Sequence, residues 1–156
     1  KNIQWIILGG GRKEEWVKTE IKNNQLEECF HMLGNFPLET MSEFYANADC
    51  MLFSLKREYI FSITIPAKVQ TYLACAKPVL AMIDGEASKI IDDAQAGLTC
   101  PSERPELLAK NIKKLSNLGQ NELDKLGQNA LNYYNNEFGR TMLMDRMESI
   151  FNKMTD

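Results

Sequence analysis

Three polar side chains in the middle of the sequence have types and spacing that could hold an anion. Lys68, Thr71 and Tyr72 stand three and four positions apart, so on a helix they share one face. The start of a helix exposes free N–H groups and the positive end of the helix dipole, which attract anions. A lysine in the first turn is unfavourable unless an anion lies nearby. One ammonium and two hydroxyls would suit a phosphate with a polyhydroxy group beside it.

The elements around these side chains are predicted to be a strand, a long connection, a helix and a second strand. A hydrophobic strand ends near Ser54, and about ten residues lead from it to the helix. Thr64 is expected to cap the helix, and Pro66 suits its first turn. The helix stops before residues 78–82, the next buried strand. Ligands of parallel sheets bind where such connections leave the strands. A solvated lysine on an ordinary amphipathic helix is the alternative.

Length and composition are typical of one domain with a sizeable core. The chain has 156 residues, 44% hydrophobic and 25% charged, with a formal net charge of −3. This balance, without a long basic run, argues against nucleic-acid binding. No apolar run reaches the length of a membrane span, and no secretory signal is visible. We expect a cytoplasmic protein, with the inner face of the membrane as a second location. Because no Met precedes Lys1, we expect a fragment.

The sulfur and imidazole groups do not suggest a metal site. Four cysteines lie far apart without a CxxC pair: Cys29, Cys50, Cys75 and Cys100. The only histidine is His31, which we expect to be a structural or edge residue. The sequence therefore predicts reduced core thiols and neither a metal nor a cofactor.

A glycine turn is a second candidate ligand feature. Gly9, Gly10 and Gly11 separate an apolar strand at residues 3–8 from a helix at residues 12–23, and glycines let a ligand approach the backbone. The turn is not a full GxGxxG fingerprint, so as a nucleotide motif it is weak. A tight strand-to-helix turn is an equal alternative.

The remaining segments continue an alternation of strands and helices. Strands are expected at residues 28–33, 48–53 and 97–100, and helices at 37–48, 86–95, 120–135 and 140–153. A further helix is expected to have Ser102 as its cap and Pro105 in its first turn. Glu86 could accept hydrogen bonds from a sugar or be a favourable first-turn carboxylate. The order predicts a Rossmann-like parallel sheet with helices on both faces and extra C-terminal helices.

These segments together resemble the C-terminal, donor-binding half of a glycosyltransferase of the GT-B architecture, and family 4 in particular. The most recognisable segment is residues 72–81, with the sequence YLACAKPVLA. The other matching segments are 7–11, 32–34, 44–49, 53–54, 84–86 and 96–98. The resemblance covers nearly all of the chain and implies one half of a GT-B fold.

Two positions depart from the family pattern. The family commonly has two glutamates eight positions apart where this chain has Ile63 and Thr71. The second glutamate binds ribose hydroxyls, which Thr71 could do only more weakly, and the first approaches the donor sugar, which Ile63 cannot. A subgroup with Pro-x-Lys at this helix start is similar to residues 66–68. It builds bacterial capsule, O-antigen and exopolysaccharide, often with UDP-linked N-acetylated amino sugars.

The resemblance implies half of a retaining hexosyltransferase that takes a nucleotide-sugar, expected to be a UDP-sugar, and needs no metal. The acceptor would be a sugar, such as a polysaccharide, or a lipid-linked acceptor. Backbone N–H groups near Thr64 and Ala67, with the Lys68 ammonium, would hold the diphosphate. Glycines would leave room for the nucleoside, and Thr71 would meet the ribose. The full set of expected donor-binding residues is Gly9, Gly10, Gly34, Ser54, Thr64, Ala67, Lys68, Thr71 and Tyr72; no catalytic residue is assigned.

The resemblance also implies parts that this chain lacks. A strand and helix ahead of Ile3, and an acceptor domain before them, would make residues 1–156 a truncated donor-binding domain that binds but hardly catalyses. Residues 140–153 would cross toward the acceptor domain or pair with another copy. A non-catalytic nucleotide-sugar module and half of a sugar-nucleotide epimerase remain alternatives. A receiver domain is disfavoured, because Asp49 alone supplies no acidic cluster.

Overall fold

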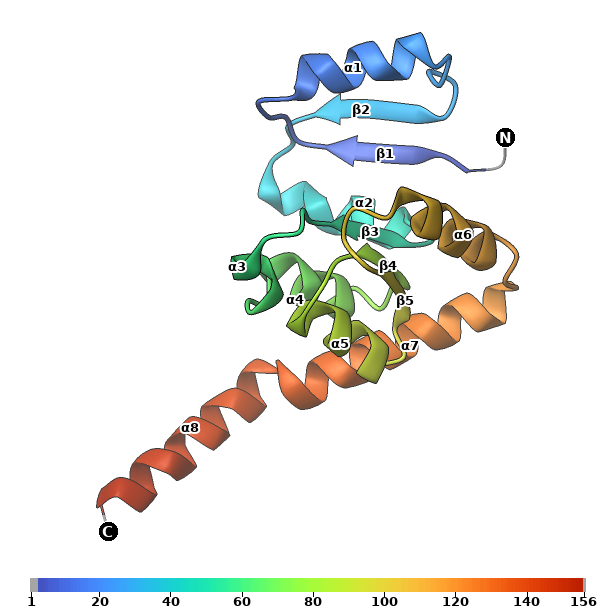
Figure 1. Ribbon diagram of the computed structural model, residues 1–156. Coiled ribbons are helices and arrows are strands. Elements are labelled where there is room, and N and C mark those ends of the chain that lie inside the picture. Colours follow the sequence, from blue (N-terminus) through green and yellow to red (C-terminus); the bar gives the residue numbers. More distant parts are fainter. Residues whose placement is uncertain (1–2, 156) are drawn as a thin grey trace. The chain divides into compact units, whose positions relative to one another are not determined.

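The computed structural model describes residues 3–155, which form two compact units (Figure 1). One unit runs to Phe44 and the other begins at Tyr45. Each unit has parallel strands of its own. That residues 1–156 act as one donor-binding domain stays a prediction.

The N-terminal unit is built on a β-α-β arrangement. β1 (Trp5–Leu8) lies parallel to β2 (Phe30–Gly34), and α1 (Glu14–Asn23) connects them. Trp5 and Phe30 are partners in the strand register, and their rings stack with centroids 5.5 Å apart. Aromatic stacking on paired strands stabilises the register.

Two short helical segments lead out of this unit. η1 (Leu38–Thr40) follows β2, and α2 (Met41–Asn47) crosses the boundary between the units. On β2, a ring nitrogen of His31 lies 2.6 Å from Oε1 of Gln4. This contact between a residue of β2 and the residue just before β1 fits the structural role that the sequence predicts for the histidine.

The C-terminal unit contains a parallel sheet with the strand order β3-β4-β5. Its strands are β3 (Met51–Ser54), β4 (Val79–Met82) and β5 (Gly97–Cys100). All pairs are parallel and in simple register. The carboxyl ends of the three strands therefore meet at one edge, where ligands of α/β sheets bind.

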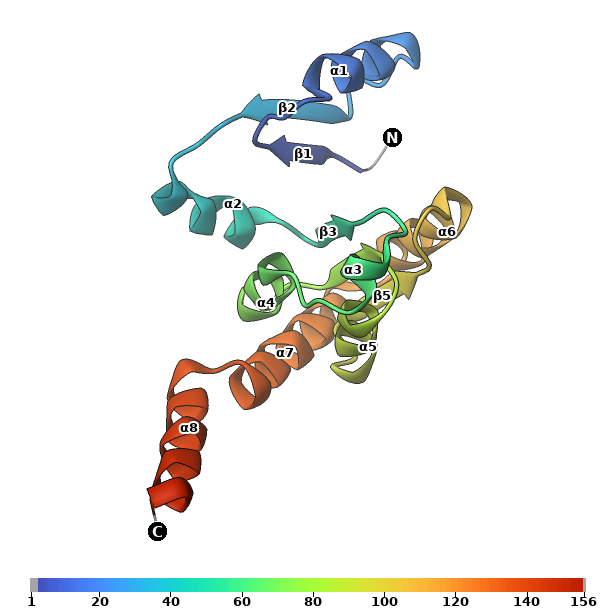
Figure 2. The same ribbon diagram turned by 60° about the vertical axis from the view of Figure 1, so that its left-hand side comes forward.

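Helices cover both faces of this sheet. One face packs against α4 (Ala67–Ala74), α5 (Glu86–Asp93) and α7 (Gln120–Glu137). α6 (Pro105–Ser116) contacts β4 and β5 on the other face. The views in Figures 1 and 2 agree in placing α6 apart from α5. The predicted Rossmann-like arrangement, one half of a GT-B fold, is confirmed.

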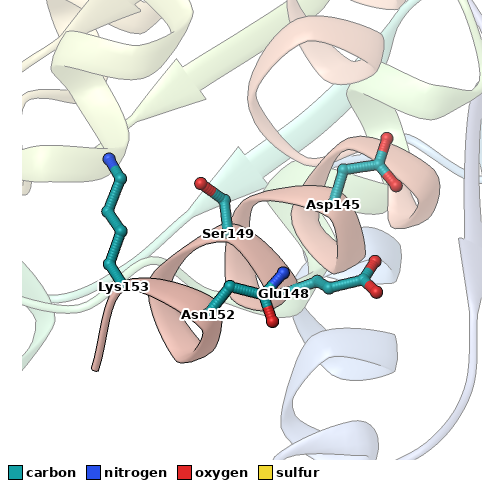
Figure 3. Close-up of a pocket in the computed structure, with 5 residues that line it drawn as sticks. All are labelled: Asp145, Glu148, Ser149, Asn152 and Lys153. Carbon is teal, nitrogen blue, oxygen red and sulfur yellow. The ribbon is translucent and has the colours of Figure 1, made fainter. Parts of the chain in front are cut away.

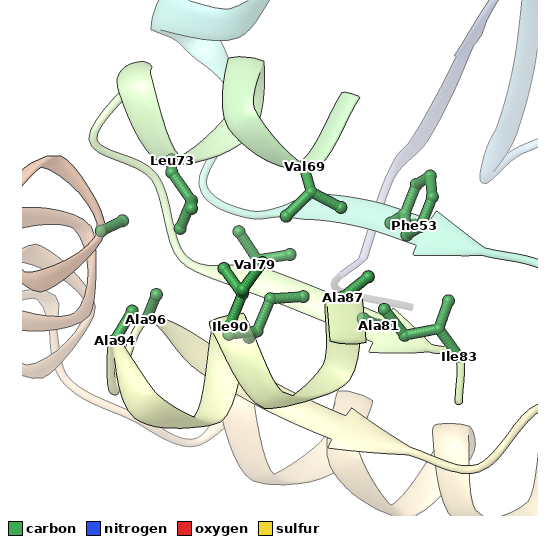
Figure 4. Packing of buried hydrophobic residues seen from close by; sticks show 12 residues of the cluster. Phe53, Val69, Leu73, Val79, Ala81, Ile83, Ala87, Ile90, Ala94 and Ala96 are labelled. Atoms are coloured by element: carbon green, nitrogen blue, oxygen red, sulfur yellow. The ribbon is translucent and has the colours of Figure 1, made fainter. Parts of the chain in front are cut away.

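The core of this unit lies between β4 and the helices of the first face. Alternate β4 residues, Val79 and Ala81, face a buried cluster that includes Leu73 of α4 and Ile91 of α5 (Figure 4). Ala130 of α7 closes the cluster. Nearly continuous burial along β4 is the property of a strand covered on both faces.

Two helices end the chain. α7 packs on α4, and α8 (Arg140–Thr155) follows with contacts to the end of α7. Met144, Ile150 and Met154 on α8 are exposed. None of the described helices is long and apolar enough to cross a membrane.

The structure corrects three details of the sequence prediction. The strands form two separate parallel sheets, of two and three strands, instead of one. The connection after β3 contains a short helix, α3 (Tyr59–Ser62). Neither predicted cap is made: Pro66 is the N-cap of α4 in place of Thr64, and Arg104 is the N-cap of α6 in place of Ser102.

Candidate functional site

The start of α4 carries positive charge that the helix itself does not compensate. Pro66 is the N-cap, with φ −64° and ψ 139°, and its carbonyl accepts the Val69 N–H at 2.9 Å. The first N–H groups of a helix have no acceptor within the helix. The first turn contains Lys68 and no acidic residue. An anion placed here would meet backbone donors, the helix dipole and one ammonium.

The three predicted side chains of this helix differ in accessibility. Lys68 and Thr71 are exposed. The Thr71 hydroxyl donates to the Ala67 carbonyl at 3.1 Å, so its oxygen remains an acceptor. Tyr72 is half-buried against the core, and burial raises the pKa of its hydroxyl. The rings of Tyr72 and Tyr45 pack edge to face, with their centroids 6.1 Å apart. The accessible chemistry is therefore an ammonium next to a hydroxyl, with Tyr72 fixed by packing.

Ser54 and Thr64 lie at the two ends of the connection that leads to α4. Ser54 is the last residue of β3 and is exposed. The Thr64 hydroxyl donates to the Ile60 carbonyl of α3 at 2.9 Å, which explains why it does not cap α4. Ile63 stands between them, 52% exposed, and brings no carboxylate to this edge. The structure thus supplies no replacement for the family's first glutamate at this position.

The glycine turn of the N-terminal unit is covered by its own helix. Gly9 donates its N–H to the Gly34 carbonyl at 2.7 Å, and both have positive φ, 97° and 77°. A Cβ on Gly10 would lie 2.6 Å from Oε2 of Glu14. Nζ of Lys18 pairs with this carboxylate at 2.9 Å and, with the Gly11 N–H, lowers its pKa. An ionised carboxylate at the turn disfavours a phosphate there; the predicted room for a nucleoside stays a prediction.

Glu86 makes an ion pair within its own helix. It stands in the first turn of α5, after the N-cap Gly85, and its carboxylate lies 2.7 Å from Nζ of Lys89. Both side chains are exposed. This geometry favours a role for Glu86 as a first-turn carboxylate over a role as a hydrogen-bond acceptor for a sugar.

The structure groups the predicted residues by unit. Gly9, Gly10 and Gly34 belong to the N-terminal unit. The C-terminal unit brings together, along the end of β3, its connection and the start of α4, the other six: Ser54, Thr64, Ala67, Lys68, Thr71 and Tyr72.

A polar cluster at the same edge has no counterpart in the sequence prediction. Nε of Arg57 lies 3.3 Å from Oδ2 of Asp84, and its guanidinium also donates to the Ser102 carbonyl at 3.2 Å. Oδ1 of Asp84 accepts the Ser102 N–H at 3.2 Å. The side chains of Arg57 and Asp84 are far apart in sequence, and only the Asp-Gly turn at Asp84 gave a local signal.

The cysteines have the character of core thiols. All four are free, and burial raises the pKa of Cys50 to about 12. Among residues 3–155, no group of three or more His, Cys, Asp or Glu side chains could hold a metal ion.

A surface hollow on α8 offers no converging chemistry. Its volume is about 450 Å³, and all the side chains that line it come from this one helix (Figure 3). They are Asp145, Glu148, Ser149, Asn152 and Lys153. A ligand site needs groups that converge from several directions, so we do not assign a site here.

The parallel sheets, with helices on both sides, define a Rossmann-like α/β fold of the GT-B kind. A family model described as "Glycosyl transferases group 1" matches residues 1–133, and the chain belongs to this family.

Known proteins of similar sequence and structure agree with this family. The chain is 29% identical over 136 residues to the probable glycosyltransferase WbjE of Pseudomonas aeruginosa, covering 86% of this chain and 34% of that protein. It is 26% identical over 115 residues to the amylovoran biosynthesis glycosyltransferase AmsK of Erwinia amylovora, covering 73% and 28%. The chain thus spans about a third of the length of these relatives.

A solved structure supports the fold. A mutant of S. aureus TarM, in complex with fondaparinux, α-GlcNAc-glycerol and UDP, superposes with a TM-score of 0.75 at 16% identity, over 96% of this chain and 29% of that chain. At this identity the similarity establishes the fold alone.

Proposed function

We propose that this chain is the donor-binding half of a retaining hexosyltransferase of glycosyltransferase family 4. It binds a UDP-sugar, with an N-acetylated amino sugar as the first candidate. The sugar goes to a polysaccharide or lipid-linked acceptor in capsule, O-antigen or exopolysaccharide synthesis. The observation that carries the proposal is the start of α4, which combines Lys68, free N–H groups and a first turn without acid at the carboxyl edge of the sheet.

The relatives favour this substrate class. AmsK is named as a glycosyltransferase of amylovoran biosynthesis. The TarM structure contains UDP and α-GlcNAc-glycerol, so a protein with this fold binds a uridine nucleotide and a compound that carries an N-acetylated amino sugar. The first supports the proposed biosynthetic role, and the second supports the proposed donor.

In the proposed mechanism the protein stabilises the leaving nucleoside diphosphate. As the bond between the sugar and the diphosphate breaks, negative charge grows on the phosphate oxygens. The N–H groups at the start of α4, including that of Ala67, and the Lys68 ammonium meet this charge without reorganising. The Thr71 hydroxyl donates its proton to the Ala67 carbonyl, so its oxygen can accept a hydrogen bond from a ribose hydroxyl. No metal is required in this scheme, because the ammonium and the helix dipole neutralise the diphosphate.

The proposal assigns the acceptor chemistry to a separate acceptor domain of the same protein. This chain then binds the donor and hardly catalyses by itself. The exposed apolar residues of α8 are available to pack against that domain or against a second copy. We propose a cytoplasmic location, with the inner membrane face as the place of a lipid-linked acceptor.

A non-catalytic nucleotide-sugar module is the second candidate. The observation in its favour is Ile63, an exposed apolar residue where the family has a glutamate near the donor sugar. A module that only binds would keep Lys68 and the α4 start and lose transfer. An epimerase half is less favoured, because no pair of acid and base carboxylates is assigned.

Calorimetric titration with UDP and GDP tests the donor site. We expect saturable UDP binding, preferred over GDP, that Lys68→Ala weakens by about tenfold or more, on the order of 1.5–3 kcal/mol for one charge-assisted contact. Lys125→Ala, an exposed lysine on α7, is the matched control and should bind as the wild type does. Absence of binding by the full-length protein would overturn the proposal. Binding without sugar transfer would favour the non-catalytic module.

A further inference from the structure

The connection from β3 to α4, residues 55–66, is poorly anchored by apolar burial. Leu55 at its start packs against the core, but several of the large hydrophobic side chains that follow are exposed: Tyr59 is 79% exposed, Ile60 55% and Ile65 40%. Segments with few buried apolar contacts open easily. Beyond Leu55, polar contacts and close backbone contacts are therefore needed to hold this connection in place.

Arg57 supplies the polar contacts that reach furthest. Its guanidinium lies 3.3 Å from Oδ2 of Asp84, in the connection after β4, and donates to the carbonyl of Ser102, after β5, at 3.2 Å. Its backbone N–H lies 3.4 Å from Oε1 of Glu103. Ser102 is only 1% exposed and donates its own N–H to Asp84. One side chain thus joins the connections that follow all three strands of the sheet.

A close backbone contact provides a second anchor for the connection. Gly85 has φ +80°, and a Cβ there would lie 2.0 Å from the Ser62 carbonyl oxygen. The connection and the turn after β4 leave a cavity of only about 10 Å³ between them, which is too small for a nucleotide. The polar cluster therefore acts on the position of the connection and is no ligand pocket itself.

We propose that Arg57 is a positioning residue for the donor site. By joining Asp84 and Ser102 it fixes the connection that ends at Pro66, and so fixes where the α4 start and Lys68 present their charge. This inference rests on the proposed donor-binding function of the α4 start. An arginine suits the role because its planar guanidinium donates in several fixed directions, whereas a lysine ammonium acts as a single point charge.

The exposure of the cluster separates this role from a general structural one. The side chains of Arg57 and Asp84 are 61% and 34% exposed, and ion pairs in such positions contribute little to global stability. Ordering a binding segment before the ligand arrives, in contrast, raises affinity directly. Loss of Arg57 should therefore reduce donor affinity while leaving the fold stable.

The test uses the full-length protein with Arg57→Ala, Arg57→Lys and Asp84→Asn. We expect UDP binding, measured by calorimetry, to weaken by about fivefold or more in Arg57→Ala, with incomplete rescue by Arg57→Lys. Hydrogen exchange should accelerate at residues 55–66, and the thermal midpoint should move by less than about 2 °C. The matched control is Arg104→Ala, which removes an arginine paired with Glu106 on its own turn and should change none of these.

A double variant shows whether Arg57 acts through the α4 start. If it positions Lys68, then Lys68→Ala should weaken UDP binding less in the Arg57→Ala background than in the wild type. Independent, multiplicative losses would overturn the positioning role. So would UDP affinity in Arg57→Ala equal to that of the wild type.

Failure of the donor site itself gives a different result. A full-length wild type that binds no UDP overturns the proposed function, and with it any donor role of Arg57. Accelerated exchange at residues 55–66 in Arg57→Ala would then still show that the cluster orders the connection. If the wild type binds UDP and Arg57→Ala binds it equally well, only the positioning role of Arg57 is overturned.

Discussion

The starts of α1 and α5 differ from the start of α4 in how the helix dipole is compensated. α1 has Glu14 in its first turn, paired with Lys18, and α5 has Glu86, paired with Lys89. In both, an internal carboxylate meets the positive end of the helix and a lysine one turn later meets the carboxylate. α4 has neither: Lys68 stands in a first turn without acid.

We infer from this difference that the backbone of a strand-to-helix turn does not by itself define an anion site. The glycine turn before α1 has the more familiar nucleotide-binding appearance, but the Glu14 carboxylate already lies against Gly10. The α4 start has a proline cap and no glycine, yet it leaves its N–H groups and Lys68 for an external anion. We therefore expect the side-chain charge in the first turn to decide which of these helix starts binds phosphate.

The largest expected effect concerns Gly10, which precedes α1, and Gly85, which precedes α5. Gly85→Ala should lower the free energy of unfolding by about 4 kcal/mol, because φ +80° is strained for alanine and the new Cβ would overlap the Ser62 backbone. The new Cβ of Gly10→Ala would come close to the end of the flexible Glu14 side chain, which can move away. This variant should lower the free energy of unfolding by less than about 1 kcal/mol. Urea unfolding of both variants measures the contrast, and equal losses would contradict it.

Charge reversal at the α4 start should have the next largest effect. Lys68→Glu removes an attractive charge and adds a repulsive one, so UDP binding should weaken by about 3 kcal/mol. Glu86→Gln at the α5 start should change UDP binding by less than about 0.5 kcal/mol, because that carboxylate is paired within its own helix. Calorimetry on the full-length protein measures both. A larger effect of Glu86→Gln on UDP binding would indicate that the donor site lies nearer to α5.

Adding a carboxylate to the first turn of α4, as in α1, should stabilise the helix but weaken UDP binding. Ala67→Glu places a carboxylate at the first helical position, which should stabilise the helix by about 0.3–1 kcal/mol. The same charge repels a diphosphate, so UDP binding should weaken by about 1–2 kcal/mol. Ala67→Gln, which is neutral, is the control. Tighter UDP binding by Ala67→Glu would rule out an anion at this helix start.

Most helices and strands could be predicted from the sequence, because apolar runs and proline or glycine punctuation are local signals. The single predicted sheet was wrong because strand pairing depends on residues distant in sequence. α3 was missed because its four residues are too few to show a helical period. Thr64 was assigned as a cap, but its hydroxyl donates to the nearer Ile60 carbonyl of α3, an acceptor that exists only because α3 forms.

The candidate site could be predicted only where it is local. Lys68 and Thr71 follow from helical spacing, and both are accessible in the structure. Arg57 and Asp84 are 27 positions apart, and nothing in either neighbourhood indicates that they meet. The carboxylate at the glycine turn was also missed, although Glu14 follows Gly10 by one helical turn, because the turn was interpreted from its glycines alone.

The smallest expected effect is a difference in acid sensitivity between the same helix starts. Lys18, together with the Gly11 N–H, holds the pKa of Glu14 below its ordinary value of 4.5. A carboxyl with a lower pKa in the folded chain stabilises the fold above its ordinary pKa and loses that contribution as the pH falls through the folded value. The α1 start should therefore loosen below pH 4.5, whereas the α4 start, which has no acid in its first turn, should not. Backbone amide shifts followed from neutral pH to about pH 3 measure both ends, and Glu14→Gln should abolish the α1 response. An equal response at α4 would show that its charge is compensated from elsewhere in the unit.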